Sequence, residues 1–496
     1  MKPNLNNQLI DGQDGKSFQI TPAPGDTTWH EQGFNLPQLI HHQQQFLLGV
    51  HSSYDQFTPC KISLTPWQIT QQQFNDALVS AKLLSRIFYK LSQMPELMLS
   101  MLQDYKVTDT TQSLAPHQLP KNLLSHFKHY LHSQVNNRRK PIKAIPVNLS
   151  RQDLLYDQDG HWKLVESNSI AAGMGPFSEV LSNLLESQSS MRFNKFAPNP
   201  AIYQQAATIF NAAKKNALLN QPVIVFLIAA DEDNIYDQNY LINQISLMGA
   251  IVKRLTLIQL KQQIKSKNNR LYLSSGETID CIYYRTGYNY KDYIFTDDAV
   301  HSSSAHSIDE LMSFRQWIEQ HQICSIPTIN HQVATSKWIQ MKLSQLSIQE
   351  IKINFELSQQ ESENVKQTLA NNYQIISHQQ QIVEALKERC WILKSQHEGG
   401  NSVYDISTPL PTLDLQHEKY LLMQKINSVI RQEEIHLLTA NTIQSTHSVI
   451  SELGIFTVGN DHHYGGYLLR SKPANQLQCG VHSAGGFLDT LVIADK

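Results

Sequence analysis

The chain has 496 residues, 41% of them hydrophobic, and a formal net charge of −2. This length gives room for two to four structural units with an ample core. The near-neutral charge argues against a nucleic-acid-binding protein, which would carry a basic surplus. The sequence has no stretch long and apolar enough to span a membrane, so we expect neither nucleic acid nor a membrane as a partner.

The cysteines and the first residues indicate the compartment. The chain has 5 cysteines, which are scattered and lack C-x-x-C spacing. This usage favours free thiols in a reducing compartment over a disulfide framework or a zinc site. The first residues lack the apolar core of a secretory signal. We therefore expect a cytoplasmic protein.

The predicted elements begin with a polar segment followed by helices. Residues 1–49 are polar and punctuated by proline and glycine, which predicts a loosely packed extension. From Thr70 to Asp104 apolar residues recur at three- and four-residue spacing, which predicts an amphipathic helix or a pair of helices. A second helical pattern follows Pro120.

Two strands are predicted next. Residues 144–149 start a strand, and we expect Arg151 just past its end. Residues 162–168 alternate between apolar and polar side chains, as a half-buried strand does. Because successive side chains of a strand point to opposite faces, Glu166 and Asn168 are expected on one face.

A new unit begins at Pro222. The apolar run at 223–230 is typical of a central parallel strand that is buried on both faces. A helical pattern and strands at 251–252 and 279–284 follow, which predicts a doubly wound parallel sheet over about 222–330. Ligands of such sheets bind at the carboxyl ends of the strands. The polar residues that follow predicted strand ends are Glu232, Asn234, Gln238 and Arg285.

Beyond Lys337 the pattern changes to an α+β type, with helices followed by several strands. The chain is thereby divided into four parts. These are a polar N-terminal extension (1–49), a helical segment with the first part of the main body (50–221), the doubly wound sheet (222–330) and the remaining α+β region (331–496).

A glycine-rich loop follows the predicted strand at 391–393. It reads Lys394-Ser-Gln-His-Glu398-Gly399-Gly400-Asn401. Glycines let the backbone approach an anionic ligand closely, a lysine supplies charge for phosphate, and a carboxylate is a ligand for Mg²⁺. A solvated turn has the same composition, so the loop by itself leaves both interpretations open.

Several well-known motifs are excluded. There is no G-x-x-x-x-G-K-[ST] and no H-E-x-x-H, which argues against a P-loop and a zincin. Gly173-Met-Gly175 lacks the third glycine of a dinucleotide site. The segment 480–485 differs by one residue from the G-x-S-x-G elbow of serine hydrolases, so we reject that class too.

Charged residues near predicted strand ends form three chemical sets. Singly, each is also compatible with a surface charge or a structural ion pair. A hard-cation set is formed by Glu166, Asn168 and Glu398, a polyphosphate set by Lys337, Lys394 and Lys472, and a carboxylate-binding set by Arg151, Arg285 and Arg470.

Six segments, in order along the chain, resemble motifs of eukaryotic-type glutathione synthetase, an ATP-grasp ligase. The resemblance covers about residues 54–492. The matching segments are Glu166-Ser-Asn168-Ser-Ile170 (E-I-N-T-I), Glu232-Asp-Asn234-Ile-Tyr-Asp-Gln238 (E-R-N-I-F-D-Q), Arg285-Thr-Gly-Tyr288 (R-D-G-Y), Ala334-Thr-Ser-Lys337 (A-G-T-K), Ser451-Glu452-Leu-Gly-Ile-Phe456 (S-E-L-G-I-F) and Leu468-Leu-Arg470-Ser-Lys472 (L-L-R-T-K).

The resemblance implies both a fold and a reaction. The fold would be of mixed α/β and α+β class, an ATP-grasp body with N-terminal helices and an inserted doubly wound parallel-sheet substrate domain. The reaction would join γ-glutamylcysteine and glycine through an acyl phosphate, with ATP as substrate and Mg²⁺ as cofactor. The family also suggests a homodimer.

The resemblance implies site residues as well. Mg²⁺ would be held by Glu166, Asn168 and Glu398. ATP would be contacted by Lys337, Lys394, Glu398, Gly399, Gly400, Asn401, Tyr404, Met423, Gln424, Lys425, Ile426, Glu452 and Lys472. The γ-glutamyl donor would be held by Arg151, Ala171, Ala172, Gly173, Glu232, Asn234, Gln238, Arg285 and Tyr288, and the incoming amino acid would lie near Arg470, Val481 and His482. Catalysis would rest on Arg151, Lys337, Lys394 and Arg470.

This sequence departs from the family motifs near the substrates. The serine-containing I-S-A-S turn reads Ile170-Ala171-Ala172-Gly173, and the G-V-A-A-G loop reads Gly480-Val481-His482-Ser483-Ala484. The glycine-rich loop is one residue shorter than the family's E-G-G-G-N-N-L-Y. Two alternatives therefore stand beside glutathione synthesis: a ligase for another γ-glutamyl donor or amine acceptor, and a non-catalytic binding or effector relative.

Overall fold

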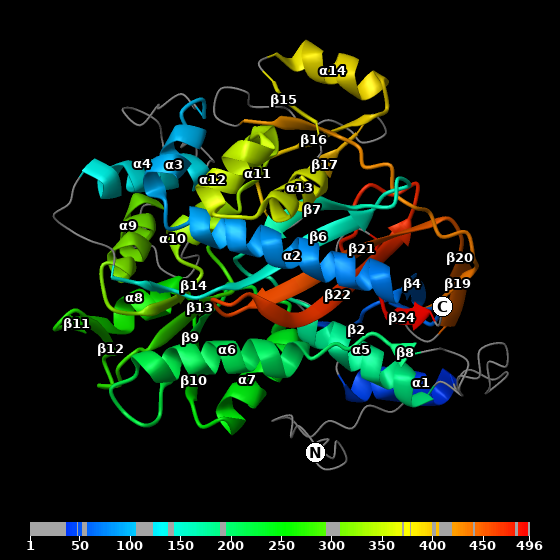
Figure 1. Cartoon of the computed structure of the whole chain (residues 1–496). Coiled ribbons are helices and arrows are strands. Elements are labelled where there is room, and N and C mark those ends of the chain that lie inside the picture. Colours follow the sequence, from blue (N-terminus) through cyan, green and yellow to red (C-terminus); the bar gives the residue numbers. More distant parts are fainter. Residues whose placement is uncertain are drawn as a thin grey trace, which may run out of the picture.

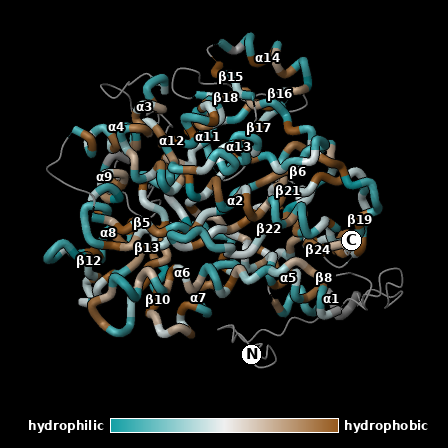
Figure 2. Tube along the Cα trace, viewed as in Figure 1, coloured by the Kyte–Doolittle hydropathy of each residue, from teal (hydrophilic) through white to brown (hydrophobic). Residues whose placement is uncertain are grey.

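The computed structural model describes most of the chain and shows a mixed α/β protein with several sheets (Figure 1). The described residues are 36–46, 48–51, 57–105, 123–136, 143–188, 195–293, 308–369, 372–376, 378–398, 403–405, 419–439, 442–481 and 485–494. Figure 2 shows hydrophobic residues along the inner strands, in agreement with their burial.

An eight-stranded sheet forms the centre of the molecule. Helix α2 (Gln71–Leu91) crosses one face of this sheet, and α5 (Gly175–Gln188) and α6 (Ala201–Asn216) cover the other (Figure 1). In spatial order the strands are β20 (Thr442–Thr446), β19 (Ile435–Thr439), β3 (Ile62–Ser63), β23 (Phe487–Asp489), β22 (His463–Pro473), β21 (Val449–Val458), β6 (Leu149–Tyr156) and β7 (Trp162–Asn168).

A second, five-stranded sheet is parallel throughout. Alternate residues of β9 face different hydrophobic clusters, so helices cover both faces: α6 and α7 (Ile235–Leu247) on one, α8 (Leu257–Gln263) and α9 (Ile308–Glu319) on the other. The strand order is β10 (Ile251–Leu255), β9 (Val223–Leu227), β13 (Cys281–Tyr284), β14 (Cys324–Ile326) and β5 (Ile145–Pro146). This pairing agrees with the βαβ pattern of the sequence.

A four-stranded antiparallel sheet with helix α14 (Gln379–Lys387) lies at the top of Figure 1. It has its own small hydrophobic cluster, which includes Ile382, Leu393 and Leu422. The strands are β15 (Tyr373–Ile375), β18 (Leu421–Gln424), β16 (Trp391–Lys394) and β17 (Val403–Tyr404).

The other elements connect these layers. They are α1 (Leu36–Gln45), α3 (Pro95–Met101), α4 (Leu123–Asn136), α10 (Ile329–Ala334), α11 (Lys337–Gln345), α12 (Ile348–Phe355), α13 (Gln359–Thr368), the hairpin of β1 (Gly49–His51) and β2 (Phe57–Pro59), the hairpin of β11 (Ile264–Lys267) and β12 (Arg270–Leu273), and the sheet of β4 (Trp67–Thr70), β24 (Leu491–Ala494) and β8 (Lys195–Phe196).

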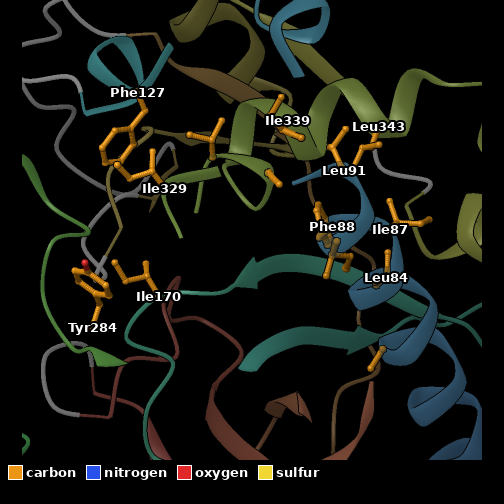
Figure 3. Packing of buried hydrophobic residues seen from close by; sticks show 14 of the residues in the cluster. Leu84, Ile87, Phe88, Leu91, Phe127, Ile170, Tyr284, Ile329, Ile339 and Leu343 are labelled. Carbon is orange, nitrogen blue, oxygen red and sulfur yellow. The ribbon is translucent and has the colours of Figure 1, made fainter. Parts of the chain in front are cut away.

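The largest core joins α2 to α11 and to the central sheet. Figure 3 shows Phe88 and Leu91 of α2 close to Ile339 and Leu343 of α11. Helix α2 begins at a capping box formed by Thr70 and Gln73. Because α11 begins at Lys337, this packing fixes the position of that lysine relative to the sheet.

Two expectations about the first half of the chain were wrong. The loosely packed start does not reach residue 49, because α1 is helical and Leu48 is fully buried. The segment 144–149 is not one strand: β5 pairs in the parallel sheet and β6 starts a strand of the central sheet. Arg151 consequently lies inside β6 rather than past a strand end. Among the described residues, no helix combines the length and apolar character that a membrane crossing needs.

Candidate active site

The hairpin of β6 and β7 carries the first group of predicted site residues. Arg151 is paired with Asn168, and Asp153 with Glu166, across the two strands. The amide of Asn168 donates to Glu166 Oε1 at 3.3 Å and to Asp153 Oδ2 at 2.9 Å. Glu166 and Asn168 therefore share a face of the strand, which confirms the prediction from alternation.

Glu166 is surrounded by positive charge. Burial by itself raises the pKa of this carboxyl, but the ammonium groups of Lys337 and Lys394 and the guanidinium groups of Arg470 and Arg151 hold it at about 2. These four cations come from α11, β16, β22 and β6. The fold thus brings together four residues that are widely separated in sequence, around one carboxylate that stays ionised at neutral pH.

The segment that precedes the two glycines lies over the start of α11. Lys337 Nζ is 3.0 Å from Glu398 Oε2 and donates to the carbonyl oxygen of His397. Gln396 Oε1 accepts from the backbone N–H of Trp338 at 3.1 Å. Burial raises the pKa of Glu398, and Lys337 opposes this shift. Gly399, Gly400 and Asn401 lie outside the described residues.

Strands β21 and β22 add the third group. Arg470 forms ion pairs with Glu452 and, at 3.1 Å, with Asp153. Burial opposes the charge of Arg470, but Glu452 and Asp153 raise its pKa, so the guanidinium stays protonated. Lys472 Nζ donates to the carbonyl of Leu477 at 2.5 Å.

Four of the residues predicted to contact ATP lie on strand β18 of the four-stranded sheet or directly after it. Met423 is buried and faces its partner Ile392 across β18 and β16. Gln424 is exposed, and its Oε1 accepts from the amide of Asn372 at 2.6 Å. Lys425 is 3.4 Å from Asp405, directly after Tyr404. Ile426 is partly buried just past the end of β18.

The predicted donor residues gather at the carboxyl ends of β9, β10 and β13. Arg285 directly follows β13 and is buried, and Gln238 of α7 is almost fully buried. Several buried polar atoms here have no hydrogen-bond partner among the described residues. They are Asn234 Oδ1, Gln238 Nε2, Arg254 Nε and Arg285 Nε.

The electrostatics of this pocket keep Arg285 charged. Burial lowers its pKa, but Tyr283, Glu232 and Asp237 raise it above the usual value. Tyr288, three residues further on, has a backbone N–H that donates to Asp292, and burial raises the pKa of its phenol to about 12. The pocket therefore pairs a fixed cation with the carboxylate of Glu232.

The loop after β7 lies against the predicted donor residues. Ala171 and Met174 adopt positive φ angles of 51° and 70°, which is unusual for residues other than glycine. The carboxylate of Asp237 accepts from the backbone N–H groups of Met174 (2.9 Å) and Phe177 (3.3 Å), which holds the loop in place.

Gly173 lies at the centre of this loop, and the buried Ala172 precedes it. A Cβ atom at Gly173 would meet Arg285 Nη2 at 2.6 Å and the Asn234 amide nitrogen at 3.2 Å. On its other side, Arg151 Nη1 donates to the Gly173 carbonyl at 3.2 Å. The missing side chain therefore lets two arginines approach the same peptide unit.

Residues 38–493 match the family described as eukaryotic glutathione synthase, ATP binding domain. The chain belongs to this family. The resemblance that the six motifs indicated is thereby confirmed, and the family is one of ATP-dependent ligases.

Relatives in this family are distant. The chloroplastic glutathione synthetase of Solanum lycopersicum is 24% identical over 87% of this chain and 77% of its own. The glutathione synthetase of Dictyostelium discoideum is 25% identical over 88% and 92%, and that of Homo sapiens 26% identical over 70% and 74%. The solved apo structure of a glutathione synthetase-like effector from Globodera pallida matches with a TM-score of 0.63 over 92% of this chain and 96% of that chain, at 14% identity. This last match shows a common fold.

The predicted site contains oxygen ligands of the kind that suits Mg²⁺. Glu166 is ionised, Glu398 is a second carboxylate near the same lysine, and Asn168 uses its amide nitrogen for hydrogen bonds, which leaves the amide oxygen for a cation. Oxygen ligands of this kind are what Mg²⁺ prefers. Within the described ranges, histidine, cysteine and carboxylate side chains form no preassembled group of three or more.

Sequence reasoning gave no role to three residues that contact the predicted site residues: Asp153, Asp237 and Arg254. Asp153 could have been found, because it lies two residues after Arg151 and so shares its face. Arg254 meets Gln238 through a contact between distant segments, which leaves no local pattern. Asp237 belongs to the segment that matches E-R-N-I-F-D-Q, but the resemblance assigned it no role. The predicted acceptor residues are only partly placed: Val481 is half-buried, and His482 and Ser483 lie outside the described residues.

Proposed function

We propose that this protein is an ATP-dependent ligase that joins a γ-glutamyl dipeptide to a small amino acid, with γ-glutamylcysteine and glycine as substrates and glutathione as product. The observation that carries the proposal is the convergence of four cations around the ionised Glu166, beside a pocket of unpaired polar atoms. The cluster of cations suits phosphoryl transfer, and the unpaired polar atoms suit the binding of an amino acid.

The donor pocket is complementary to a zwitterion. An α-ammonium group needs acceptors, and the pocket offers the Glu232 carboxylate and the unpaired Asn234 Oδ1. An α-carboxylate needs hydrogen-bond donors, and these are the Arg285 guanidinium and the unpaired Gln238 Nε2. A γ-glutamyl group carries both charges on one carbon, so it would satisfy both sets at once.

The distal carboxylate of the donor would then lie toward the central sheet. Arg151 links the two regions, because it contacts Gly173 in the loop after β7 and takes part in the cation cluster around Glu166. In the proposed reaction this carboxylate attacks the γ-phosphorus of ATP, ADP leaves, and an acyl phosphate forms. The acceptor amine then attacks the carbonyl carbon, loses a proton and expels inorganic phosphate.

The cations of the site offset the charge of the transferring phosphoryl group. Lys337, Lys394 and Lys472 would hold the phosphates, and Arg470 would lie beside the acyl group and the incoming amino acid. Glu166, Asn168 and Glu398 would hold Mg²⁺, which supplies further charge stabilisation at the phosphate oxygens. In the structure, Lys337 is engaged by Glu398 and His397, so it has to exchange partners when the nucleotide binds.

An acyl phosphate hydrolyses in water, so the reaction needs a cover. The four-stranded sheet with α14 would serve as that cover. The lid segment predicted from the sequence, Glu398 to Tyr404, lies partly outside the described residues. The arrangement would be that of an ATP-grasp body with an inserted donor-binding domain at 222–330. A homodimer and a cytoplasmic location stay predictions of the resemblance.

A second candidate function is a ligase for a different donor. The loss of two hydroxyl groups at Ala171 and Gly173 favours it, because Gly173 lies against Arg285 and the backbone N–H of Ala171 donates to the carbonyl of Tyr284, the residue before Arg285. A site that hydrogen-bonds a substrate discriminates strongly by its polar groups, so their removal can change the substrate.

The test is phosphate release from ATP and Mg²⁺ across a panel of γ-glutamyl donors and amine acceptors. We expect release to require a donor and an acceptor together, and to be fastest with γ-glutamylcysteine and glycine. Fastest release with another pair would favour the second candidate. If the folded protein fails to release phosphate with every donor–acceptor pair of the panel, the ligase proposal is wrong.

A further inference from the structure

The residue Asp153 touches three predicted site residues and was not part of any motif. It lies on β6 with no exposed surface. Its Oδ1 accepts from Arg151 Nε at 2.5 Å. Its Oδ2 accepts from Arg151 Nη2 at 2.8 Å, Asn168 Nδ2 at 2.9 Å and Arg470 Nη2 at 3.1 Å. One oxygen atom is thus the meeting point of three side chains from three different strands.

These contacts exclude other roles for Asp153. A carboxylate has about four acceptor positions, and Asp153 accepts four hydrogen bonds from the arginines and the amide, one at Oδ1 and three at Oδ2. With no exposed surface, the group has no access to substrate, to a metal ion or to a proton in the reaction. Its remaining effect is on the side chains that it binds.

The arginines need such a group because they repel each other. Arg151 and Arg470 both direct a terminal nitrogen to the same oxygen, so their positive charges lie close together in a buried site. Among the described residues, Asp153 is the carboxylate that contacts both; Glu452 contacts Arg470. Without Asp153, repulsion would separate the two guanidinium groups.

The neighbouring strand leaves space for this arrangement. Gly454 of β21 is paired with Asp153, and a Cβ atom there would meet Asp153 Oδ1 at 2.5 Å and Arg151 Cδ at 2.7 Å. The sequence therefore contains both the carboxylate and the gap that receives it.

We propose that Asp153 is a positioning residue that holds Arg151, Arg470 and Asn168 in one geometry, and thereby joins the donor side of the site to the acceptor side. The inference rests on the proposed ligase function. Arg151 reaches the loop after β7 at Gly173, and Arg470 reaches Glu452 on the far side. Loss of Asp153 should therefore affect the donor and the acceptor together. ATP binding should stay largely intact, because Asn168 keeps its second hydrogen bond, to Glu166 at 3.3 Å.

The first test compares Asp153→Asn with the parent enzyme. We expect kcat/KM for the donor to fall about a hundredfold, because a misplacement of about 1 Å can cost this much. The KM values of donor and acceptor should both rise, while the KM of ATP changes less than about twofold, an effect too small to count as lost positioning. A purely structural role would instead lower the active fraction, and hence kcat, with every KM unchanged.

Two further variants separate positioning from folding. Gly454→Ala keeps all charges but displaces the Arg151–Asp153 pair, so the same pattern is expected at about a tenfold level. Asp489→Asn is the matched control, because Asp489 is equally buried and pairs with Arg431 at 2.6 Å in the same sheet. It also accepts from Ser471, whose side chain points to the opposite face of β22 from Arg470 and Lys472. This control variant should lower the unfolding temperature without changing any KM.

The outcomes distinguish the inference from the function on which it rests. The positioning role is overturned if the parent enzyme is active and the Asp153→Asn variant keeps the parental KM values. Its unfolding temperature would then resemble that of Asp489→Asn. A parent enzyme without ligase activity overturns the function itself. In that case donor binding measured by calorimetry still tests the positioning: weaker binding in both Asp153→Asn and Gly454→Ala supports it, and unchanged binding overturns it.

Discussion

The nucleotide side and the donor side of the site differ in how their polar groups are satisfied. On the nucleotide side, the cations already have partners: Lys337 binds Glu398, Lys394 donates to the Val165 carbonyl at 2.9 Å, and Lys472 binds the Leu477 carbonyl. On the donor side, buried atoms of Gln238 and Arg285 have no partner within the described ranges.

This difference indicates two modes of binding. A buried unpaired polar group costs free energy, so the donor side is poised to bind a ligand that pairs it without rearrangement. The nucleotide side has to break an ion pair and backbone contacts before it can hold phosphate. Movement is therefore expected in the segment 395–398 and the four-stranded sheet, while the donor pocket stays in place.

The largest effect is expected from Glu398→Gln. Glu398 partners Lys337 in the structure and would bind Mg²⁺ in the reaction, so its charge is needed in both states. Removal of one carboxylate from a metal site should lower kcat by about a hundredfold or more. Glu363→Gln, on the exposed side of α13, is the control and should have the parental rate. Near-parental turnover of Glu398→Gln at saturating Mg²⁺ would remove Glu398 from the site.

The next effect concerns the donor side. Arg285→Lys keeps the charge but loses the two-pronged hydrogen bonding that suits a carboxylate. The KM of the donor should rise by roughly tenfold to a hundredfold, the value of one or two hydrogen bonds to a charged group, with the KM of ATP unchanged. Arg270→Lys, in the same region but bonded to the Asn216 carbonyl, is the control. Equal losses for both substrates would make Arg285 a structural residue.

A smaller effect on the donor is expected from Gly173→Ala. The added methyl group would come within 2.6 Å of Arg285 Nη2 and displace it, so the donor KM should rise by about tenfold or less, since Nη2 is the far end of a flexible side chain. The measurement is a double-mutant cycle with Arg285→Lys. Because the two residues are in contact, their effects should not be additive. Additive effects would show that Gly173 does not act through Arg285.

The smallest effect on activity near neutral pH is expected from changes at two buried histidines, His331 and His462. Their predicted effect is on the free energy of unfolding in acid. Burial first, and then neighbouring positive charge, lowers the pKa of His331 to about 3 and that of His462 to about 4, from 6.5. Below pH 6.5 the unfolded chain binds protons that the folded chain does not, so the free energy of unfolding decreases as the pH is lowered. The slope should reach about 1.4 kcal/mol per pH unit for each histidine.

Urea unfolding at pH 5 and pH 7 tests this stability prediction. Stability should be complete above about pH 6.5 and fall toward pH 4. His331→Leu should reduce the slope, and His463→Gln, whose side chain is 70% exposed, should not. An unchanged slope in His331→Leu would show that His331 does not control the acid sensitivity.

The sequence predicted most elements because their patterns are local. The alternation at 162–168 gave β7 and the shared face of Glu166 and Asn168, and the apolar run at 223–230 gave β9. The short strand β5 was merged with β6, because two strands in different sheets can follow each other without a turn signal. The motifs predicted site residues within their own segments, whereas Asp153, which lies outside all six segments, was missed because its role depends on long-range contacts.

The two sides of the site meet at the donor carboxylate, which the donor side would position and the nucleotide side would phosphorylate. Transfer of oxygen-18 from a labelled donor carboxylate to inorganic phosphate tests this meeting point directly. We predict that the phosphate released in the presence of ATP, donor and acceptor carries the label. Unlabelled phosphate would mean that the donor carboxylate does not attack ATP, and would contradict the account.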